Sequence, residues 1–470
     1  MGKIGSLALI IILLVACGVA FSGTVKAGSK TIVVPDDYLT IASAIGNATD
    51  GDTVFVRNGT YEGPVNQTIV VDRSISIVGE NAKTTIIKLY PAYSVRWILT
   101  AEFFTYSDAL TLSADDCRLL NLTVIAAGYI SAIGNQIQIV GNNITTGPSI
   151  GMAVNGSYCK ITDNKMVGFI RLNGSFSHVA RNSLDNIYVY GSSNVIKDNT
   201  CQGLGLSNST YNVFSRNKVW SDSLGYSGID LMWSTDNVFF RNEISGFSSG
   251  FRFWFSSENL IIANTIADSF RSISLGGSYN NKIYLNNFVE NKLWSPYVWD
   301  DYVDRNYRDA YPNMAPATNL WDNGSLGNYW ENYNGTDANG DGIGDSPYIL
   351  RSDPSHGILD LIYGQDNFPL MTKVNIDSII LELPEWVFNL PPEPQTTNPQ
   401  IEKSTRLEPE PTAPSLNPSP ESQTQSKQEL TSPEPYPTLT VITVSAAAVV
   451  AIAAGLLVFY SKRRRGAGLV

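Results

Sequence analysis

Short runs of alternating apolar and polar residues recur along the middle of the chain. Residues 228–244, 250–266 and 272–288 share one frame: apolar-x-apolar-x-x-Ser, two residues, then Asn-x-apolar-x-x-Asn-x-apolar. Alternation with a period of two is typical of β-strands, and no run here has the 3.6-residue period of an amphipathic helix. The pattern therefore predicts a succession of short strands.

The second asparagine of this frame recurs further back along the chain. Gaps of 17 to 25 residues separate its occurrences, which are Asn121, Asn143, Asn164, Asn182, Asn199, Asn217, Asn242, Asn264 and Asn286. A period near 20 residues is typical of solenoids, and the Leu-x-x-Leu-x-Leu frame of leucine-rich repeats is absent. We predict an all-β fold, a right-handed parallel β-helix with one repeat per coil over residues 109–288.

The recurring asparagine has a physical explanation in such a fold. Coils stack at the strand spacing of about 4.8 Å, and a side-chain amide both donates and accepts hydrogen bonds. An asparagine at one corner of each coil can therefore bond its counterparts above and below. Asparagine also tolerates the left-handed backbone that a corner needs. We expect Asn121 and Asn143 to be buried in this stack, and His178 to take the corner position that Asn194 and Asn212 hold in other coils.

Residues between the inward apolar pairs of the first strand must point outward. They form two columns: Ala153, Arg171, Tyr188, Gly205, Asp230, Arg252 and Ser274, and beside them Asn155, Asn173, Tyr190, Ser207, Met232, Trp254 and Gly276. Aromatic rings stack on sugar rings, while Arg and Asp bond hydroxyls or carboxylates. The candidate glycan-binding residues are Arg171, Tyr188, Tyr190, Asp230, Arg252 and Trp254. The alternative is ordinary stacking on a solvated sheet.

Catalysis is less well supported than binding. A glycosidase needs two carboxylates across the scissile bond, and this face offers Asp230 with no obvious second acid. A lyase could use an arginine base with calcium, but aligned acidic ligands are missing. We therefore name no catalytic residue.

The two ends of the repeat region differ from it. Residues 31–61 predict a strand, an amphipathic helix at Ile41–Ile45 and another strand, a helical cap for the open end of the solenoid. Residues 28–108 hold this cap and the first coils, with an irregular aromatic insertion at 90–108. Residues 289–389 form a C-terminal cap region. Residues 390–437 are rich in Pro, Glu, Ser, Thr and Gln and predict a disordered stalk.

Both termini carry targeting signals. Residues 1–27 resemble a signal peptide, although Leu14–Cys17 also resembles a lipobox that would make Cys17 a lipidated N-terminus. Residues 438–461 predict a transmembrane helix, and the basic tail at 462–470 places that end inside the cell. We expect a single-pass protein of the cell membrane with its bulk outside.

Export makes glycosylation possible. Ten Asn-x-Ser/Thr sequons lie in the exported part: Asn47, Asn58, Asn66, Asn121, Asn143, Asn155, Asn173, Asn208, Asn323 and Asn334. The net charge of −11 argues against nucleic acid as a partner. Cys117, Cys159 and Cys201 suit neither a zinc ribbon nor a redox pair, and we predict three buried thiols.

An Asp-rich stretch in the C-terminal region has the spacing of a calcium loop. Asp337, Asn339, Asp341 and Asp345 stand at positions 1, 3, 5 and 9, the Ile343 carbonyl at 7, and Gly342 at 6. Tyr348 replaces the bidentate Glu at position 12. We predict a calcium site, and the alternative is an Asx-rich turn that needs no ion.

The ladder of asparagine corners resembles the NosD-like, pectin-lyase-like right-handed β-helix family of the archaeal cell-surface type. The cap at 31–61 and the segments 327–333, 337–348 and 366–370 extend the resemblance to about residues 31–371. The family includes lyases, hydrolases, epimerases and metal-assembly factors, so fold does not fix function. Copper, which the family name suggests, is poorly supported, because the chain has two His and no cluster of soft ligands.

We therefore expect a membrane-anchored extracellular protein that binds polysaccharide or a cell-surface glycoprotein without catalysis. The first alternative is a polysaccharide lyase or hydrolase. The second is a NosD-like metal-assembly accessory protein.

Overall fold

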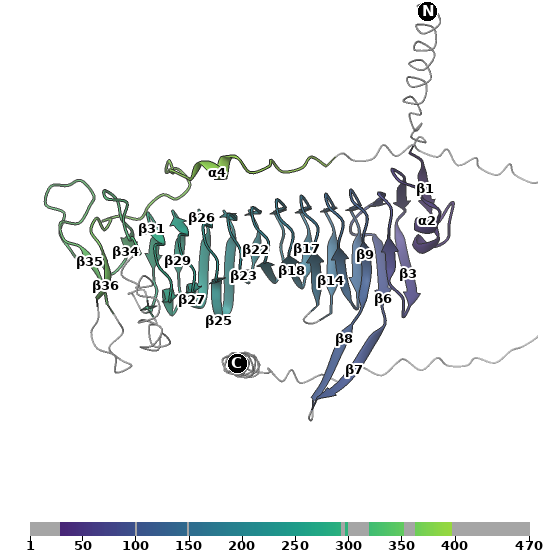
Figure 1. The fold of residues 1–470 in the computed structure, drawn as a ribbon, viewed down its shortest axis with the longest axis horizontal. Coiled ribbons are helices and arrows are strands. Elements are labelled where there is room, and N and C mark those ends of the chain that lie inside the picture. The colour runs from purple at the N-terminus through teal and green to yellow at the C-terminus, as the bar shows by residue number, and fades with distance from the viewer. Residues whose placement is uncertain are drawn as a thin grey trace, which may run out of the picture. The chain divides into compact units, whose positions relative to one another are not determined.

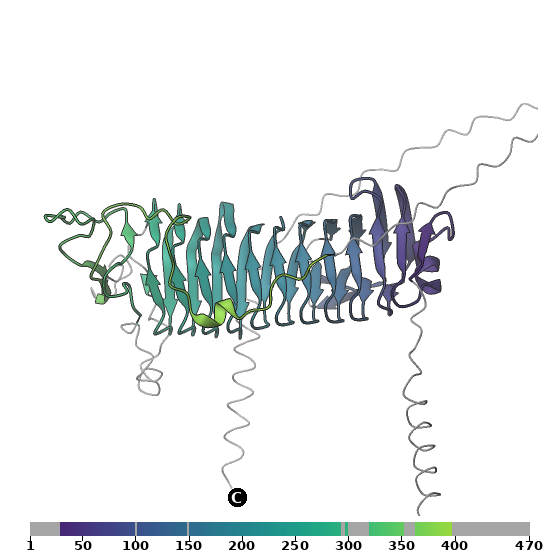
Figure 2. The same cartoon turned by 90° about the horizontal axis from the view of Figure 1, so that it is seen from above.

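The chain winds into a parallel β-solenoid, as the sequence predicts (Figure 1). The computed structural model describes residues 29–98, 101–147, 150–292, 297–298, 319–351 and 362–396. Successive coils stack side by side along the axis, and the turned view shows the same stack from above (Figure 2). The predicted signal peptide, the transmembrane segment and most of the stalk lie outside the described residues.

The first face of the solenoid is a sheet of twelve parallel strands. They are β1 (Thr31–Val34), β2 (Thr53–Val56), β5 (Ser76–Gly79), β10 (Arg118–Leu120), β13 (Gln138–Val140), β16 (Lys160–Thr162), β19 (His178–Ala180), β21 (Val195–Lys197), β24 (Val213–Ser215), β26 (Val238–Phe240), β28 (Leu260–Ile262) and β31 (Lys282–Tyr284).

The remaining coil strands belong to a five-stranded and a fifteen-stranded sheet. The smaller sheet holds β3 (Gly59–Val65), β6 (Thr85–Tyr90), β11 (Thr123–Ala126), β14 (Asn143–Thr146) and β17 (Lys165–Val167). The larger holds β4 (Ile69–Val71), β9 (Asp108–Leu112), β12 (Tyr129–Ala132), β15 (Gly151–Val154), β18 (Phe169–Leu172), β20 (Asn186–Val189), β22 (Thr200–Cys201), β23 (Gly203–Ser207), β25 (Lys218–Met232), β27 (Glu243–Trp254), β29 (Thr265–Ala267), β30 (Arg271–Gly276), β32 (Asn287–Val289), β33 (Tyr297–Val298) and β34 (Tyr329–Trp330).

Two antiparallel hairpins and two short helices complete the described part. The expected irregular insertion at 90–108 is a regular hairpin of β7 (Tyr93–Ile98) and β8 (Ala101–Tyr106). A second hairpin joins β35 (Tyr348–Arg351) to β36 (Ile362–Asp366). Helix α2 (Ile41–Asn47) contacts β1, β2 and β3 through its buried face, and α4 (Glu385–Phe388) lies near the C-terminal end of the described chain.

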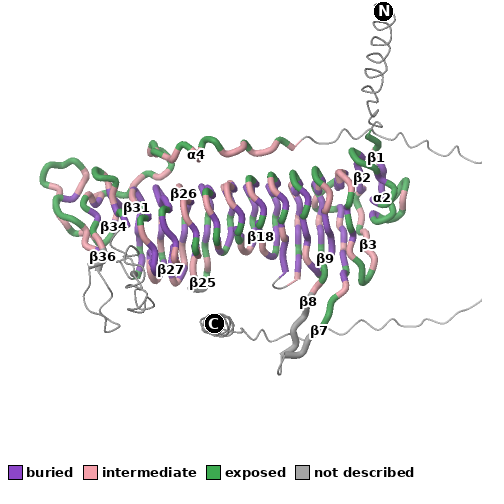
Figure 3. Tube along the Cα trace, in the orientation of Figure 1, coloured by how far each residue is buried: buried purple, intermediate pink, exposed green. Residues whose placement is uncertain are grey.

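The core is a continuous cluster of apolar side chains inside the coils, and buried positions recur in every coil along the chain (Figure 3). Alternate residues of each strand point inward, so the inward pairs of the larger sheet, such as Ile170 with Leu172 and Phe251 with Phe253, are almost fully buried. The three cysteines Cys117, Cys159 and Cys201 are buried free thiols, as predicted.

Stacked asparagines line two inner corners of the coils, one through Asn259 and Asn281 and one through Asn264 and Asn286. In most steps the side-chain oxygen accepts from the backbone N–H and the amide of the asparagine one coil earlier, as Asn264 does from Asn242 at 2.9 Å in both bonds. The amide also donates to a backbone carbonyl of the preceding coil, here from Asn242 to Phe214 at 2.9 Å. Buried polar groups at the bend are thereby paired.

The structure corrects three details of the predicted stack. The first coils use Leu122 and Asn142, so Asn121 is exposed and Asn143 is half-buried at the start of β14. The left-handed residue is the one before each stacked asparagine, for example Arg181 with φ 56° before Asn182. His178 is not a corner residue either, because Ser177 occupies that position and accepts from Cys159 N at 3.0 Å.

Both stacks continue beyond residue 288, where the sequence frame is lost. One reaches Asn319, which accepts from Asn281, and the other reaches Asn328, which accepts from Asn286. Asp366 ends the second of these stacks, because its Oδ2 accepts from Asn328 N at 2.7 Å and from Trp330 Nε1 at 2.8 Å. A carboxylate therefore accepts the last hydrogen bonds of that stack.

Residues 371–396, which we call the strap, run back across the outer face of the twelve-stranded sheet (Figures 1 and 2). Arg241 donates to the carbonyls of Ile376 and Ile379 at 2.7 and 2.8 Å. Apolar strap residues cover Val238, Leu260 and Ile262. The start of the segment expected to form the stalk, residues 391–394, therefore lies against the solenoid. No helix in the described part of the chain is long and apolar enough to cross a membrane.

Candidate functional site: a groove on the outer face

The two outward columns predicted from the alternation are confirmed by the strand register. Arg171 in β18 pairs with Tyr188 in β20, Tyr188 with Gly205 in β23, Gly205 with Asp230 in β25, and Asp230 with Arg252 in β27. Parallel in-register pairing brings each residue to about one strand spacing from the next. Residues between positions 171 and 252 of the chain therefore share one surface.

Glycines make a depression in the middle of this surface. A Cβ on Gly205 would lie 2.9 Å from Cδ1 of Tyr188, and one on Gly203 would lie 2.7 Å from Oδ1 of Asn186. Both contacts are shorter than ordinary van der Waals contact. Strand β23 carries no side chain at Gly203 and Gly205, so its backbone forms the floor of the depression. The side chains of Asn186 and Tyr188 from β20 lie against this floor.

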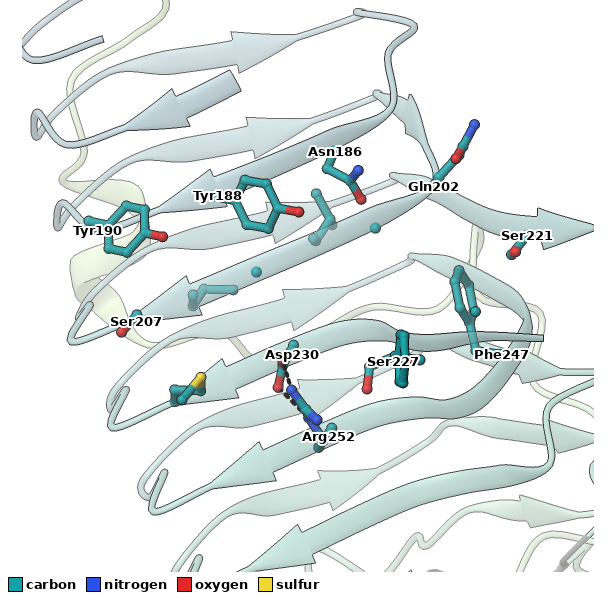
Figure 4. A pocket seen from close by; sticks show the side chains of 17 residues that line it. Asn186, Tyr188, Tyr190, Gln202, Ser207, Ser221, Ser227, Asp230, Phe247 and Arg252 are labelled. Atoms are coloured by element: carbon teal, nitrogen blue, oxygen red, sulfur yellow. Dashed lines mark hydrogen bonds and ion pairs between the residues drawn. The ribbon is translucent and has the colours of Figure 1, made fainter. Parts of the chain in front are cut away.

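Two adjoining hollows result, and together they form a groove. One, of about 500 Å³, includes Tyr188, Tyr190, Asp230 and Arg252 in its lining (Figure 4). The other, of about 750 Å³, is lined by Phe169, Arg171 and Asp185 together with the shared Asn186, Tyr188 and Tyr190. The two tyrosines are therefore common to both hollows, and their rings are available to a ligand lying across the coils.

The groove contains an ion pair and a further arginine, Arg171. Arg252 Nε donates to Asp230 Oδ1 at 2.8 Å and its Nη2 donates to Asp230 Oδ2, a bidentate arrangement. These hydrogen bonds raise the pKa of the Arg252 guanidinium. The guanidinium of Arg171 lies 5.7 Å from the ring centre of Phe169 and 6.0 Å from that of Tyr190. Burial raises the pKa of Tyr188, so this tyrosine is a neutral hydroxyl.

Five of the six candidate glycan-binding residues line the hollows, and Trp254 does not. A Cβ on Gly276 would lie 2.9 Å from Trp254 Cε3, so the indole covers the next coil. Sequence reasoning also missed Asp185, a second carboxylate in the groove. Its Oδ2 accepts from Gly168 N at 2.9 Å. Asp185 precedes β20 and lies outside the alternating strand positions, so the alternation could not predict that this residue lines the groove.

The Asp-rich loop is folded around its own backbone. Asp337 accepts from the N–H groups of Gly340, Asp341 and Gly342, and Asp345 accepts from Thr336 Oγ1 and Ala338 N. Asn339 donates to Asp341 at 2.9 Å, and Asp341 accepts from the N–H of Ile343 at 2.8 Å. Within the described residues no group of three His, Cys, Asp or Glu could hold a metal ion. These contacts are those of an Asx-rich turn, and the calcium site stays a prediction.

Residues 121–335, a little under half of the chain, match the family model described as "Periplasmic copper-binding protein (NosD)". This stretch is NosD-like. It includes the whole groove and most of the asparagine stack. No curated protein matches the chain.

Solved structures also resemble this chain. The A-module of the mannuronan C-5 epimerase AlgE6 from Azotobacter vinelandii is 12% identical, with 55% of this chain and 83% of that one covered and a TM-score of 0.43. An exopolygalacturonase from Thermotoga maritima is 9% identical, with coverages of 53% and 83% and a TM-score of 0.42. A mannuronic acid-specific family 6 lyase from human gut microbiota is 14% identical, with coverages of 56% and 82% and a TM-score of 0.31. At these values the likenesses carry no argument about reaction or ligand.

The residues that the structure describes do not fit the copper of the family description. Burial raises the pKa of Cys117 and Cys159 to about 11 and that of Cys201 to about 12, so all three remain protonated inside the core. His178 Nε2 is bonded to the carbonyl of Pro391 at 2.8 Å. These groups are neither together nor free to bind a metal.

Proposed function

We propose that the NosD-like chain binds polysaccharide in the groove of its fifteen-stranded sheet, without catalysis. The observation that carries the proposal is the bare floor at Gly203 and Gly205 between two aromatic side chains and the Asp230–Arg252 pair. Sugar rings present apolar faces and polar edges. Tyr188 and Tyr190 suit the faces, and the ion pair offers donors and acceptors to the edges.

The state of the two groove carboxylates supports binding over hydrolysis. Asp230 accepts hydrogen bonds from Nε and Nη2 of Arg252, and Asp185 accepts one from the backbone N–H of Gly168. Both carboxylates are therefore engaged by groups of the protein itself, whereas a glycosidase needs two carboxyl groups directed at the scissile bond. A lyase or hydrolase is the second candidate, because two carboxylates do line the same groove.

The bulk of the chain is proposed to lie outside the cell, attached by the predicted helix at 438–461. The family model is described as periplasmic, which agrees with an exported β-helix. The ligand is then a polysaccharide or a glycoprotein of the cell surface.

A glycan-array screen of the purified protein tests the proposal. The double variant Tyr188→Ala/Tyr190→Ala should lose binding, because it removes both rings from the groove. Tyr158→Ala is the matched control, since Tyr158 is an exposed aromatic that stacks on Phe176 outside the groove. Release of reducing ends or of unsaturated sugars is measured in parallel. Clear release, or binding that survives loss of both tyrosines, would refute the non-catalytic groove.

A further inference from the structure

Four basic side chains gather on the twelve-stranded sheet where the strap crosses its last described strands. Lys160 begins β16, His178 begins β19, Arg181 follows β19 and Lys197 ends β21. We call these four residues the cationic cradle. The cradle lies on a different sheet from the groove, so the proposed binding of polysaccharide does not involve it.

The carboxylate of Glu393 in the strap receives the donors of the cradle. Its Oε1 lies 2.8 Å from Arg181 Nη2 and 3.4 Å from Lys160 Nζ. Its Oε2 lies 3.2 Å from Arg181 Nη1 and 3.1 Å from Lys197 Nζ. Three cations from separate coils therefore converge on the oxygens of one acidic group. Arginine and lysine are also the residues with which proteins bind phosphate, the arginine through its paired N–H groups.

The solenoid orients the arginine of the cradle by itself. Asp163, which follows β16, accepts from Arg181 Nε at 2.8 Å and from its Nη2 at 3.0 Å. The plane of the guanidinium is therefore set without Glu393. A donor that is positioned before a ligand arrives loses less freedom on binding, which favours affinity.

The charges of this cluster do not balance while Glu393 occupies the cradle. The two lysines and the arginine contribute three positive charges, whereas Asp163 and Glu393 contribute two negative ones. The hydrogen bonds from Arg181 lower the pKa of Glu393 to about 2, so its carboxylate carries its single charge throughout the physiological range. One positive charge remains in excess, beside a lysine, Lys160, whose side chain is only 10% exposed. A doubly charged anion in place of this carboxylate would leave no excess.

Residues 388–396, which we call the strap end, form the replaceable side of the contact. None of them is fully buried. Burial lowers the pKa of His178, so its ring is neutral and its Nε2–H donates to Pro391 O at 2.8 Å. Lys160 Nζ donates to Pro394 O, also at 2.8 Å. Both donors belong to the cradle, so an anion that engages them also removes hydrogen bonds from the backbone of the strap end.

We propose that the cationic cradle is a binding site for a doubly charged oxyanion, phosphate or a phosphate monoester, which takes the place of Glu393 and releases the strap end. A phosphate group carries about −1.5 to −2 charges near pH 7 and has three strong acceptor oxygens, whereas a carboxylate carries one charge on two oxygens. The third oxygen can accept from His178 Nε2–H once Pro391 has left. The exchange balances the charges of the cradle and leaves the coils as they are.

Equilibrium dialysis of the full-length protein against labelled inorganic phosphate tests the site. Glu393→Gln should bind phosphate about tenfold more tightly than the wild type or better, because a tethered carboxylate competes at a high effective concentration. Adding Arg181→Gln to this variant should abolish binding. Acetate at equal ionic strength should compete far less well than phosphate, since a single charge leaves the excess in place.

Two control variants separate the cradle from general surface charge. Arg216 is bonded to Asp198 through Nε and Nη2, as Arg181 is to Asp163, but it lies outside the cradle. Adding Arg216→Gln to Glu393→Gln should therefore leave phosphate binding unchanged. Glu385→Gln alters an exposed glutamate of the same strap in α4 and should bind phosphate as weakly as the wild type.

Hydrogen exchange of the wild-type protein tests the release of the strap end and needs no variant. The amides of residues 388–396 should exchange several-fold faster in phosphate than in sodium chloride of equal ionic strength, while those of the coils stay unchanged. Glycerol phosphate identifies the source: tighter binding than that of inorganic phosphate assigns the site to an ester, and weaker binding assigns it to the free ion.

Three results would overturn the site: no phosphate binding in Glu393→Gln, binding that survives loss of Arg181, or acetate that binds as well as phosphate. Phosphate binding to the wild type with unchanged exchange in residues 388–396 would overturn the release of the strap end.

Discussion

Replacing Asn142 by alanine should destabilise the fold far more than the same change at the adjacent Asn143. The spacing in the sequence predicts that Asn143 belongs to the stack, whereas the structure places Asn142 there. Asn142 is 1% exposed and its side chain makes three hydrogen bonds, to Leu122 N, Leu119 O and Asn164 Oδ1, at 3.1, 2.8 and 3.1 Å.

The size of the effect follows from these bonds. A net hydrogen bond contributes about 1 kcal/mol, and a buried donor left without a partner costs about 1–3 kcal/mol. Asn142→Ala removes all three bonds and leaves the Leu122 N–H with none, so we expect a loss of about 3–5 kcal/mol. Asn143 is half-buried and donates at 3.2 and 3.4 Å, so its replacement should cost about 1 kcal/mol or less.

Denaturant unfolding followed by circular dichroism measures both values. Both variants should retain the wild-type m-value, which reports the surface exposed on unfolding. Equal losses for the two variants, or a larger loss for Asn143→Ala, would refute the register of the stack and with it the pairing of the first coils.

Three further predictions concern the groove, the end of the stack and the Asp-rich loop. Gly205→Leu should fill the depression and abolish polysaccharide binding while thermal unfolding stays cooperative, and unchanged binding would contradict the groove as the site. Burial raises the pKa of Asp366 to about 6. The folded protein binds this proton more tightly than the unfolded chain, in which the pKa of Asp is near 4. Protonation of Asp366 therefore stabilises the fold at low pH, and that stabilisation is lost as the pH rises from about 4 to about 6. The unfolding free energy of the wild type relative to Asp366→Asn should therefore fall by on the order of 2–3 kcal/mol between pH 4 and pH 7, and a flat difference would contradict this burial. If residues 337–345 bind calcium, millimolar calcium should raise the melting temperature above that in chelator, and Asp337→Asn/Asp341→Asn should remove the rise; equal melting temperatures would count against the site.

The sequence predicts the groove surface well because its evidence is local. Side chains of a strand alternate between faces, so the position of Tyr188 or Asp230 relative to its inward neighbours fixes its direction. Stacking in register then follows from the repeat. Asp185 was missed because it lies in a turn before β20, where alternation has no meaning, and Trp254 was included although its ring lies over Gly276.

The repeat alone determined the parallel solenoid, its buried thiols and its outward columns, because each depends on a period that every coil repeats. The tertiary structure determined the features that do not repeat from coil to coil. It set the register of the first coils, where Asn142 rather than Asn143 is buried, since only packing distinguishes two adjacent asparagines. It carried one asparagine stack past residue 288 to Asn319 and the other to Asn328 and Asp366, where the spacing in the sequence is lost. It also placed Pro391 against His178 and Glu393 against Arg181, contacts of hydrogen bonding and charge between residues more than 200 positions apart that no local pattern encodes.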